Sequence, residues 1–265
     1  MAARVWGERQ RMNIVRYSNG SGEGEFGILE GSTVYAATGD IFSGLTRGDE
    51  VGSVDSVKLL APIQPGKIVC IGLNYALHAK ESGAELPKEP VVFMKPPSAL
   101  IGPGDTIEIA NPENNTDYEA ELAVVIGKQA RDVEAADAAG YILGYTAAND
   151  VSDRKLQRGD GQWIRAKGFD TYCPLGPAIA TDLDPSNLAI GSRLNGETRQ
   201  ASSTSDLIFD VPFLVSFLSK VMTLNPGDVI LTGTPEGVGP MKPGDTIEVE
   251  IAGIGVLKNP VAKRG

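Results

Sequence analysis

The fold of this chain is decided by the stretch Asp117-Tyr118-Glu119-Ala120-Glu121-Leu122-Ala123-Val124-Val125-Ile126-Gly127. Its pattern predicts a β-strand, on which Glu119 and Glu121 point to the same face because side chains alternate. Both faces become apolar after Glu121, which is typical of a buried strand with two acids at its mouth. An ordinary half-exposed strand would instead carry polar residues at Ala123 and Val125. Two buried like charges need compensation, which a divalent cation would supply.

A third acid, Asp150, ends the apolar run 141–150, which also reads as a strand. Three oxygen donors without Cys or His suit Mg²⁺, Mn²⁺ or Ca²⁺ better than Zn²⁺. Three protein ligands leave positions open for water and a chelating substrate. Spacing alone does not bring Asp150 to the glutamate pair, so their meeting is an expectation.

The composition is that of an ordinary globular protein, with 265 residues, 42% hydrophobic and 22% charged. The formal net charge of −10, without a basic stripe, argues against nucleic acid or an anionic membrane as partner. No apolar run approaches the ~18–20 residues of a transmembrane helix. Cys70 and Cys173 form neither a metal motif nor a disulfide framework. We therefore expect a cytoplasmic protein.

The chain divides into three expected parts. Residues 1–11 form an N-terminal extension, possessing no secretory signal, which we expect to be disordered. Residues 12–61 form a small β-rich domain, and residues 62–265 form a catalytic metal-binding domain after a proline-marked boundary. Pro-Gly-Asp recurs at 103–105, 226–228 and 243–245, each time as a turn that feeds a strand.

Two helices are expected. One spans about 74–82, and the other follows Asp210 as N-cap. Apolar residues at helical spacing on the second helix predict only core packing; they are Phe213, Leu214, Phe217, Leu218 and Val221.

Three further side chains could carry chemistry. His78 is the one histidine, and on a helix Glu81 at i+3 would orient it as a general base. Lys167 could hold a substrate oxyanion, although an exposed lysine is the plainer interpretation. Thr234 lies in a tight turn after a strand, where its hydroxyl and the backbone amides could bind a carboxylate. A solvated helix turn would equally explain the His78–Glu81 spacing.

Taken together, these motifs resemble the fumarylacetoacetate hydrolase family from about residue 67 to 260. The resemblance rests on ordered matches at 72–81, 93–96, 119–127, 149–157, 167–171, 226–230 and 232–235. It implies a mainly β fold with some helix (α+β), namely a mixed β-sandwich roll behind a small N-terminal domain, and a homodimer. It also implies that Glu119, Glu121 and Asp150 bind Mg²⁺ or Mn²⁺.

The resemblance further implies roles in turnover. His78 and Glu81 would activate water on a closing lid, Lys167 would be catalytic, and the small-molecule keto-acid substrate would contact four more residues: Tyr75, Arg154, Gln162 and Thr234. The implied reaction is metal-dependent hydrolysis of a C–C bond in a 2,4-dioxo acid of the acylpyruvate or fumarylpyruvate type. Three alternatives remain: oxaloacetate decarboxylation, isomerisation or decarboxylation of 2-hydroxymuconate-type keto acids in aromatic catabolism, and a non-catalytic metal-binding scaffold of the same fold.

Overall fold

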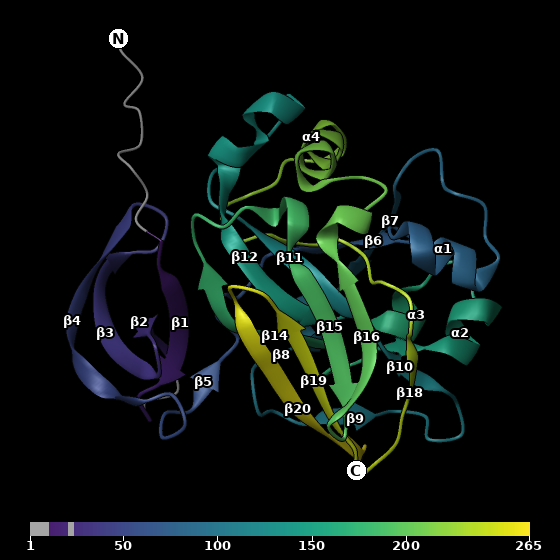
Figure 1. The fold of residues 1–265 in the computed structure, drawn as a ribbon, viewed down its shortest axis with the longest axis horizontal. Helices are drawn as coiled ribbons and strands as arrows, with labels where there is room; N and C mark the ends of the chain where they lie inside the picture. The colour runs from purple at the N-terminus through teal and green to yellow at the C-terminus, as the bar shows by residue number, and fades with distance from the viewer. Residues whose placement is uncertain (1–10, 21–23) are drawn as a thin grey trace.

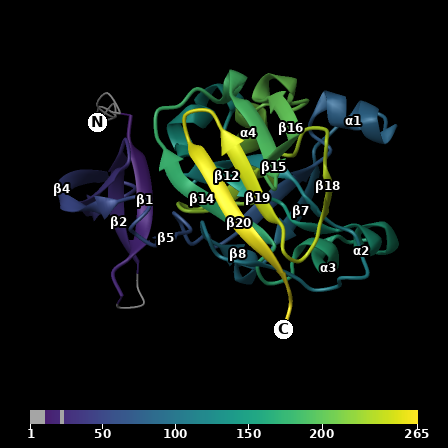
Figure 2. The ribbon, with the colours of Figure 1, turned by 60° about the horizontal axis from the view of Figure 1, so that its bottom comes forward.

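Strands dominate the computed structural model, which describes residues 11–20 and 24–265. The N-terminal strands lie at one end of the molecule in both views (Figures 1 and 2). At the other end lie three helices, α1 (Ala76–Ser82), α2 (Arg154–Gly159) and α3 (Ile164–Lys167). The prediction of a mainly β fold with few helices and a small N-terminal β-rich unit is confirmed. The expected disorder of residues 1–11 falls almost wholly on residues 1–10, which lie outside the described residues.

The largest sheet has the order β4-β3-β2-β1-β14-β12-β11-β17-β6-β7, with β5 paired to β1 and β8 to β14. Its strands are β1 (Asn13–Ser18), β2 (Gly24–Glu30), β3 (Thr33–Asp40), β4 (Gly44–Ser53), β5 (Leu59–Leu60), β6 (Ile68–Gly72), β7 (Val91–Lys95), β8 (Leu100–Ile101), β11 (Ala120–Ile126), β12 (Ile142–Asn149), β14 (Cys173–Ala180) and β17 (Val229–Leu231). Because β1 pairs with β14, the N-terminal unit extends the main sheet. The domain boundary at residue 61 stays a prediction.

Two smaller sheets complete the fold. One has the order β13-β10-β18, and its strands are β10 (Thr116–Tyr118), β13 (Ser152–Asp153) and β18 (Gly239–Met241). The other has the order β16-β15-β19-β20-β9, and its strands are β9 (Ile107–Ile109), β15 (Ala189–Leu194), β16 (Glu197–Ser203), β19 (Thr246–Ile251) and β20 (Gly255–Lys263). Short 3₁₀ turns lie at Pro97–Ala99, Ala135–Tyr141, Pro185–Asn187 and Thr204–Asp206.

The stretch 117–127 is not one continuous strand, so that part of the prediction is wrong. The chain leaves one sheet after Tyr118 and enters another at Ala120. At Glu119 the N–H donates to Asn149 Oδ1 at 2.9 Å, and the carbonyl accepts from the Asp150 N–H at 2.9 Å. The Asn149 side chain thus takes the place of a backbone carbonyl from a neighbouring strand, which interrupts the β-ladder at Glu119. Beyond it, every residue of β11 is buried, as predicted.

The two faces of β11 belong to different cores. Leu122 and Val124 pack with Leu214 of α4 (Val211–Val221), whereas Ala123 and Val125 pack in a second cluster. The alternation of a strand assigns Glu119 and Glu121 to the side of Ala123 and Val125. Two acids therefore sit where the second core ends.

The three Pro-Gly-Asp turns are confirmed. Glycine has φ of +77°, +86° and +98° at Gly104, Gly227 and Gly244, a region that favours residues without Cβ. In each turn the aspartate accepts a hydrogen bond from the backbone N–H three residues before it, as Asp228 does from Asn225 at 2.6 Å. The turns lead into β9, β17 and β19.

The helices are α1 (Ala76–Ser82), α2 (Arg154–Gly159), α3 (Ile164–Lys167) and α4 (Val211–Val221). Asp210 caps α4 by accepting from the Phe213 N–H at 2.9 Å, as predicted. Within the predicted stripe Leu214 and Leu218 are buried, but Phe213 and Val221 are exposed because they lie off the face that meets the core. No helix of the described ranges is both long and apolar enough to cross a membrane.

Candidate active site

Three acids meet at the mouth of β11. Glu119 and Glu121 come from the β10–β11 segment, and Asp150 follows β12, which pairs with β11. Each offers an oxygen that lies within 4.8 Å of the other two, and all three residues are buried. The structure therefore brings Asp150 to the glutamate pair, as the sequence led us to expect.

Three buried or largely buried cations surround these acids. Lys167 Nζ donates to Glu119 at 3.0 Å, to Asp150 at 2.5 Å and to Ser152 Oγ at 2.8 Å. Arg154 binds Glu119 Oε1 at 2.6 Å and Asp117 Oδ2 at 2.7 Å. The plainer interpretation of Lys167 as an exposed lysine is excluded, because the residue is only 2% exposed.

Lys95 is the third cation, and its place in the site was not predicted from the sequence. Its ammonium pairs with Asp150 Oδ1 and donates to the Val151 carbonyl at 3.1 Å. Lys95 ends β7, and a lysine directly after the apolar run 91–94 was the sequence signal that could have identified it.

Glu119 is held in its charged form. Burial raises the pKa of Glu119, but the charges and hydrogen bonds of Lys167 and Arg154 outweigh burial and lower the pKa to about 2. Its carboxylate is therefore ionised at neutral pH without any metal.

Glu121 is in the opposite situation. Its Oε2 accepts from the Gly233 N–H at 2.7 Å, and no described lysine or arginine pairs with it. Burial, reinforced by the charges of Asp150 and Glu119, raises the pKa of Glu121 well above its ordinary value. A divalent cation would supply the missing positive charge, so the acids fit Mg²⁺ or Mn²⁺ in number, donor type and charge. Glu119, Glu121 and Asp150 are the residues that would hold it.

His78 and Glu81 lie on α1, apart from the strands that carry the three acids. His78 Nδ1 is 3.2 Å from Glu81 Oε2, which confirms the predicted i,i+3 contact. Glu81 also accepts from the Gly237 N–H at 3.2 Å, so the loop after β17 holds it in place. A carboxylate at Nδ1 favours the tautomer whose Nε2 is free to accept a proton.

One cavity of about 230 Å³ joins these groups. His78, Lys167, Arg154 and Thr234 line it together with the three acids, and so do residues that the sequence analysis did not select: Ile71, Gly72, Leu73, Ser82, Phe93, Gln157 and Trp163. Its size suits a small acid better than a large cofactor.

Two predicted substrate contacts lie elsewhere. Gln162 is exposed and does not line the cavity; its neighbour Trp163 does, against Phe93 at 5.2 Å between ring centroids. Tyr75 is fully buried outside the lining, and its hydroxyl has no hydrogen-bond partner. The roles predicted for these two residues stay predictions.

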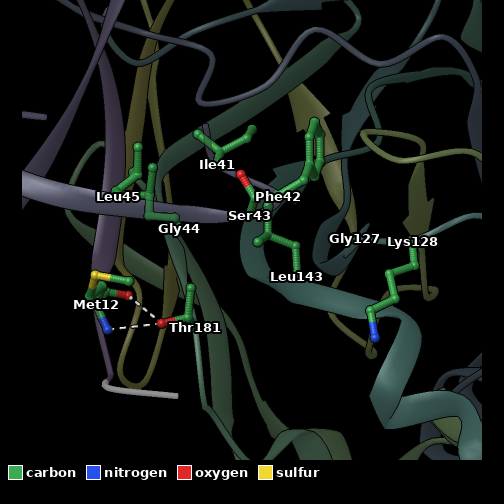
Figure 3. Close-up of a pocket in the computed structure, with 11 residues that line it drawn as sticks. Met12, Ile41, Phe42, Ser43, Gly44, Leu45, Gly127, Lys128, Leu143 and Thr181 are labelled. Carbon is green, nitrogen blue, oxygen red and sulfur yellow. Dashed lines mark hydrogen bonds between the residues drawn. The ribbon is translucent and has the colours of Figure 1, made fainter. Parts of the chain in front are cut away.

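A second cavity, of about 140 Å³, lies between the N-terminal unit and the body (Figure 3). Ile41, Phe42 and Leu45 of the β3–β4 region face Leu143 across it, and Met12 binds Thr181 at its edge. Its lining carries no acid and no histidine. The first cavity is therefore the candidate active site.

Comparisons with known proteins agree with this fold and site. The family model described as fumarylacetoacetate (FAA) hydrolase C-terminal matches residues 67–262, and one described as Rv2993c-like, N-terminal, matches residues 12–62. Protein Rv2993c of Mycobacterium tuberculosis is 51% identical over 212 residues, which cover 79% of this chain and 80% of that protein.

Two further relatives carry named activities. A Xenopus laevis protein named oxaloacetate tautomerase fahd2, mitochondrial, is 44% identical over 232 residues, covering 83% of this chain and 73% of that protein. The crystal structure of 2-hydroxyhepta-2,4-diene-1,7-dioate isomerase from Mycobacterium marinum is 43% identical, covers 96% of this chain and 99% of its own, and superposes with a TM-score of 0.87. Given these matches, this chain belongs to the fumarylacetoacetate hydrolase family of enzymes.

Proposed function

We propose that this chain is a divalent-metal-dependent enzyme that moves a proton between the carbon and oxygen of a small 2-oxo acid, as a keto–enol isomerase. The observation that carries the proposal is the buried acid triad, with no described basic side chain paired to Glu121, which lines a cavity of about 230 Å³ together with His78. Such a site fits one small acid bound at the metal with one general base beside it.

A bound Mg²⁺ or Mn²⁺ would stabilise negative charge on the 2-oxo oxygen. His78 would take the proton from carbon 3, while Glu81 orients the ring and stabilises its charged form. The imidazolium would then give the proton to the oxygen at carbon 2, which completes the enol, and the reverse order of steps would return the keto form. Thr234 lines the same cavity, and its hydroxyl would donate to the carboxylate of the acid. The three hydrogens of Lys167 point to Glu119, Asp150 and Ser152, so the lysine would fix the acids.

The relatives support this chemistry, because one is named a tautomerase of oxaloacetate and another an isomerase of a 2-hydroxy dienoic diacid. Both names describe a proton moved next to a 2-oxo or enol carbon.

Hydrolysis of an acylpyruvate is the second candidate, and the His78–Glu81 pair favours it. A paired imidazole at the mouth of a cavity can deprotonate water as well as carbon. Water attack on the distal carbonyl would break the C3–C4 bond and leave the enol form of pyruvate. The predicted hydrolase thus uses the same residues, and decarboxylation of oxaloacetate would yield the same product.

Three rates separate these reactions. The first is decay of enol-oxaloacetate absorbance; the others are pyruvate release from oxaloacetate and from acetylpyruvate, each with Mg²⁺, with EDTA and with Mg²⁺ but no protein. Metal-dependent enol decay without pyruvate would support the isomerase, and pyruvate from acetylpyruvate the hydrolase. Pyruvate only from oxaloacetate would establish a decarboxylase. No metal-dependent rate above the protein-free control would refute the proposal and favour the scaffold.

A further inference from the structure

Gln200 lies next to the candidate site, and its side-chain amide hydrogen-bonds to residues of the site. It belongs to β16, in the five-stranded sheet, and is 1% exposed. Its Oε1 accepts from the Ala120 N–H at 3.0 Å and from Ser192 Oγ at 2.9 Å. Its Nε2 donates to Thr234 Oγ1 at 2.9 Å and to the Pro235 carbonyl at 2.8 Å. All four hydrogen-bonding positions of the amide are therefore occupied.

Two backbone groups fix which way this amide faces. The Ala120 N–H can only donate, so it requires the amide oxygen, and the Pro235 carbonyl can only accept, so it requires the NH₂ group. The amide cannot flip without losing both bonds. Gln200 consequently always presents an N–H to Thr234.

This fixed direction determines what the Thr234 hydroxyl can do. Because its oxygen already accepts from Gln200, its own hydrogen is available to donate, and no described residue accepts it. Thr234 lines the cavity of the acid triad. A carboxylate or enolate oxygen bound there would meet a donor rather than a lone pair.

The Gln200 amide hydrogen-bonds to both the segment that carries the two glutamates and the loop that carries Thr234. Ala120 stands between Glu119 and Glu121, while Thr234 lies on the loop whose Gly233 N–H binds Glu121. That loop packs directly against β16. The evidence is that a Cβ at Gly237 would lie 2.2 Å from the Arg199 carbonyl oxygen, so only glycine fits there. Gln200 thus links the acid segment to the substrate-binding loop.

We infer that Gln200 is a positioning residue that orients the Thr234 hydroxyl as a hydrogen-bond donor to the acid head of the substrate. The inference rests on the proposed function, because it requires a 2-oxo acid at the triad.

The test uses oxalate, a planar stand-in for the enol form of a 2-oxo acid, titrated calorimetrically into the full-length protein loaded with Mg²⁺. Thr234→Val should weaken oxalate binding about 10- to 100-fold, which is the loss of affinity expected when a hydrogen bond to a charged group is removed. Thr234→Ser, which keeps the hydroxyl, should retain the affinity. Gln200→Glu and Gln200→Met should each weaken oxalate binding to a similar extent. Adding Thr234→Val to either variant should lower the oxalate affinity little further.

Ser192→Ala is the matched control, because it removes a hydrogen bond to the same amide on the side away from Thr234 and should leave oxalate affinity unchanged. Mg²⁺ affinity and the melting temperature, measured for every variant, separate a lost donor from a disturbed acid site or fold. Oxalate affinity unchanged in a folded, Mg²⁺-binding Gln200→Glu or Gln200→Met variant would overturn the inference alone. Failure of oxalate to bind the Mg²⁺-loaded wild type would overturn the proposed function with it.

Discussion

Replacing Glu119 by glutamine should destabilise the metal-free protein, whereas the same replacement at Glu121 should not, although the two positions are only two residues apart. Glu119 has a folded-state pKa of about 2 against an ordinary 4.5. A difference of about 2.5 pH units corresponds to about 3 kcal/mol of stability. Because the folded-state pKa is the lower one, this stability is present above pH 4.5 and lost as pH falls through about 2. Glu119→Gln should therefore destabilise the metal-free protein by about 3 kcal/mol at pH 7.5.

Glu121→Gln should leave the metal-free protein as stable as wild type or more so. Its raised pKa means that charging Glu121 opposes folding, and its contribution is lost as pH rises through the folded-state pKa. Glutamine keeps an oxygen for the Gly233 N–H and places an NH₂ group beside the remaining acids. Both variants should lose the stabilisation that Mg²⁺ gives to wild type.

The assay is urea unfolding at pH 7.5, in EDTA and in Mg²⁺, for wild type and the two variants. The signature is a large loss for Glu119→Gln and none for Glu121→Gln in EDTA. Equal losses in EDTA would refute the charge assignment, because they would show that Glu121 is as well neutralised as Glu119. Full stabilisation of either variant by Mg²⁺ would remove that residue from the metal site.

Three further outcomes follow from the same geometry. His78→Ala should lower turnover by about 10²- to 10⁴-fold and leave the affinities for Mg²⁺ and for oxalate unchanged. Ser82→Ala, at another cavity residue on α1, is the control, and normal turnover of His78→Ala would exclude the histidine as base. Mg²⁺ binding should release up to one proton from Glu121, seen as a calorimetric heat that depends on the buffer, with affinity rising as pH rises; a heat independent of buffer would contradict this. Burial raises the pKa of Cys173 to about 12 and that of Cys70 well above its ordinary range, so both thiols should react with a thiol reagent only after denaturation, and rapid reaction of the native protein would contradict their burial.

Local patterns carried most of what the sequence could predict. The Glu119–Glu121 pair, the His78–Glu81 pair and the Pro-Gly-Asp turns each depend on residues within a few positions of one another. The interruption at Glu119 was not predictable, because its cause is an asparagine side chain 30 residues away. The same holds for Gln200, an ordinary polar residue on a strand until its partner Ala120, 80 residues away, is known.

The position of Gln162 shows a different limit. Strand and helix periodicity did not predict the four-residue helix α3, which begins at Ile164. That short turn places Trp163 and Lys167 on the inside and leaves Gln162 exposed. Resemblance identified the segment correctly, but only the local turn determines which of its side chains reach the cavity.

Under the proposed function, the balance of buried charge would explain why one site could serve several reactions. The described groups around the triad comprise four carboxylates and three cations: Asp117, Glu119, Glu121, Asp150, Lys95, Lys167 and Arg154. Their sum is one negative charge, located on Glu121 if ionised, and a divalent cation changes it to one positive charge. Under the proposed function, the carboxylate of a 2-oxo acid would restore neutrality, which would favour its binding in a buried site of low dielectric. Every 2-oxo acid has this head group, so the metal side would not distinguish among substrates, and the choice would fall to the group near His78 and Trp163, which line the same cavity.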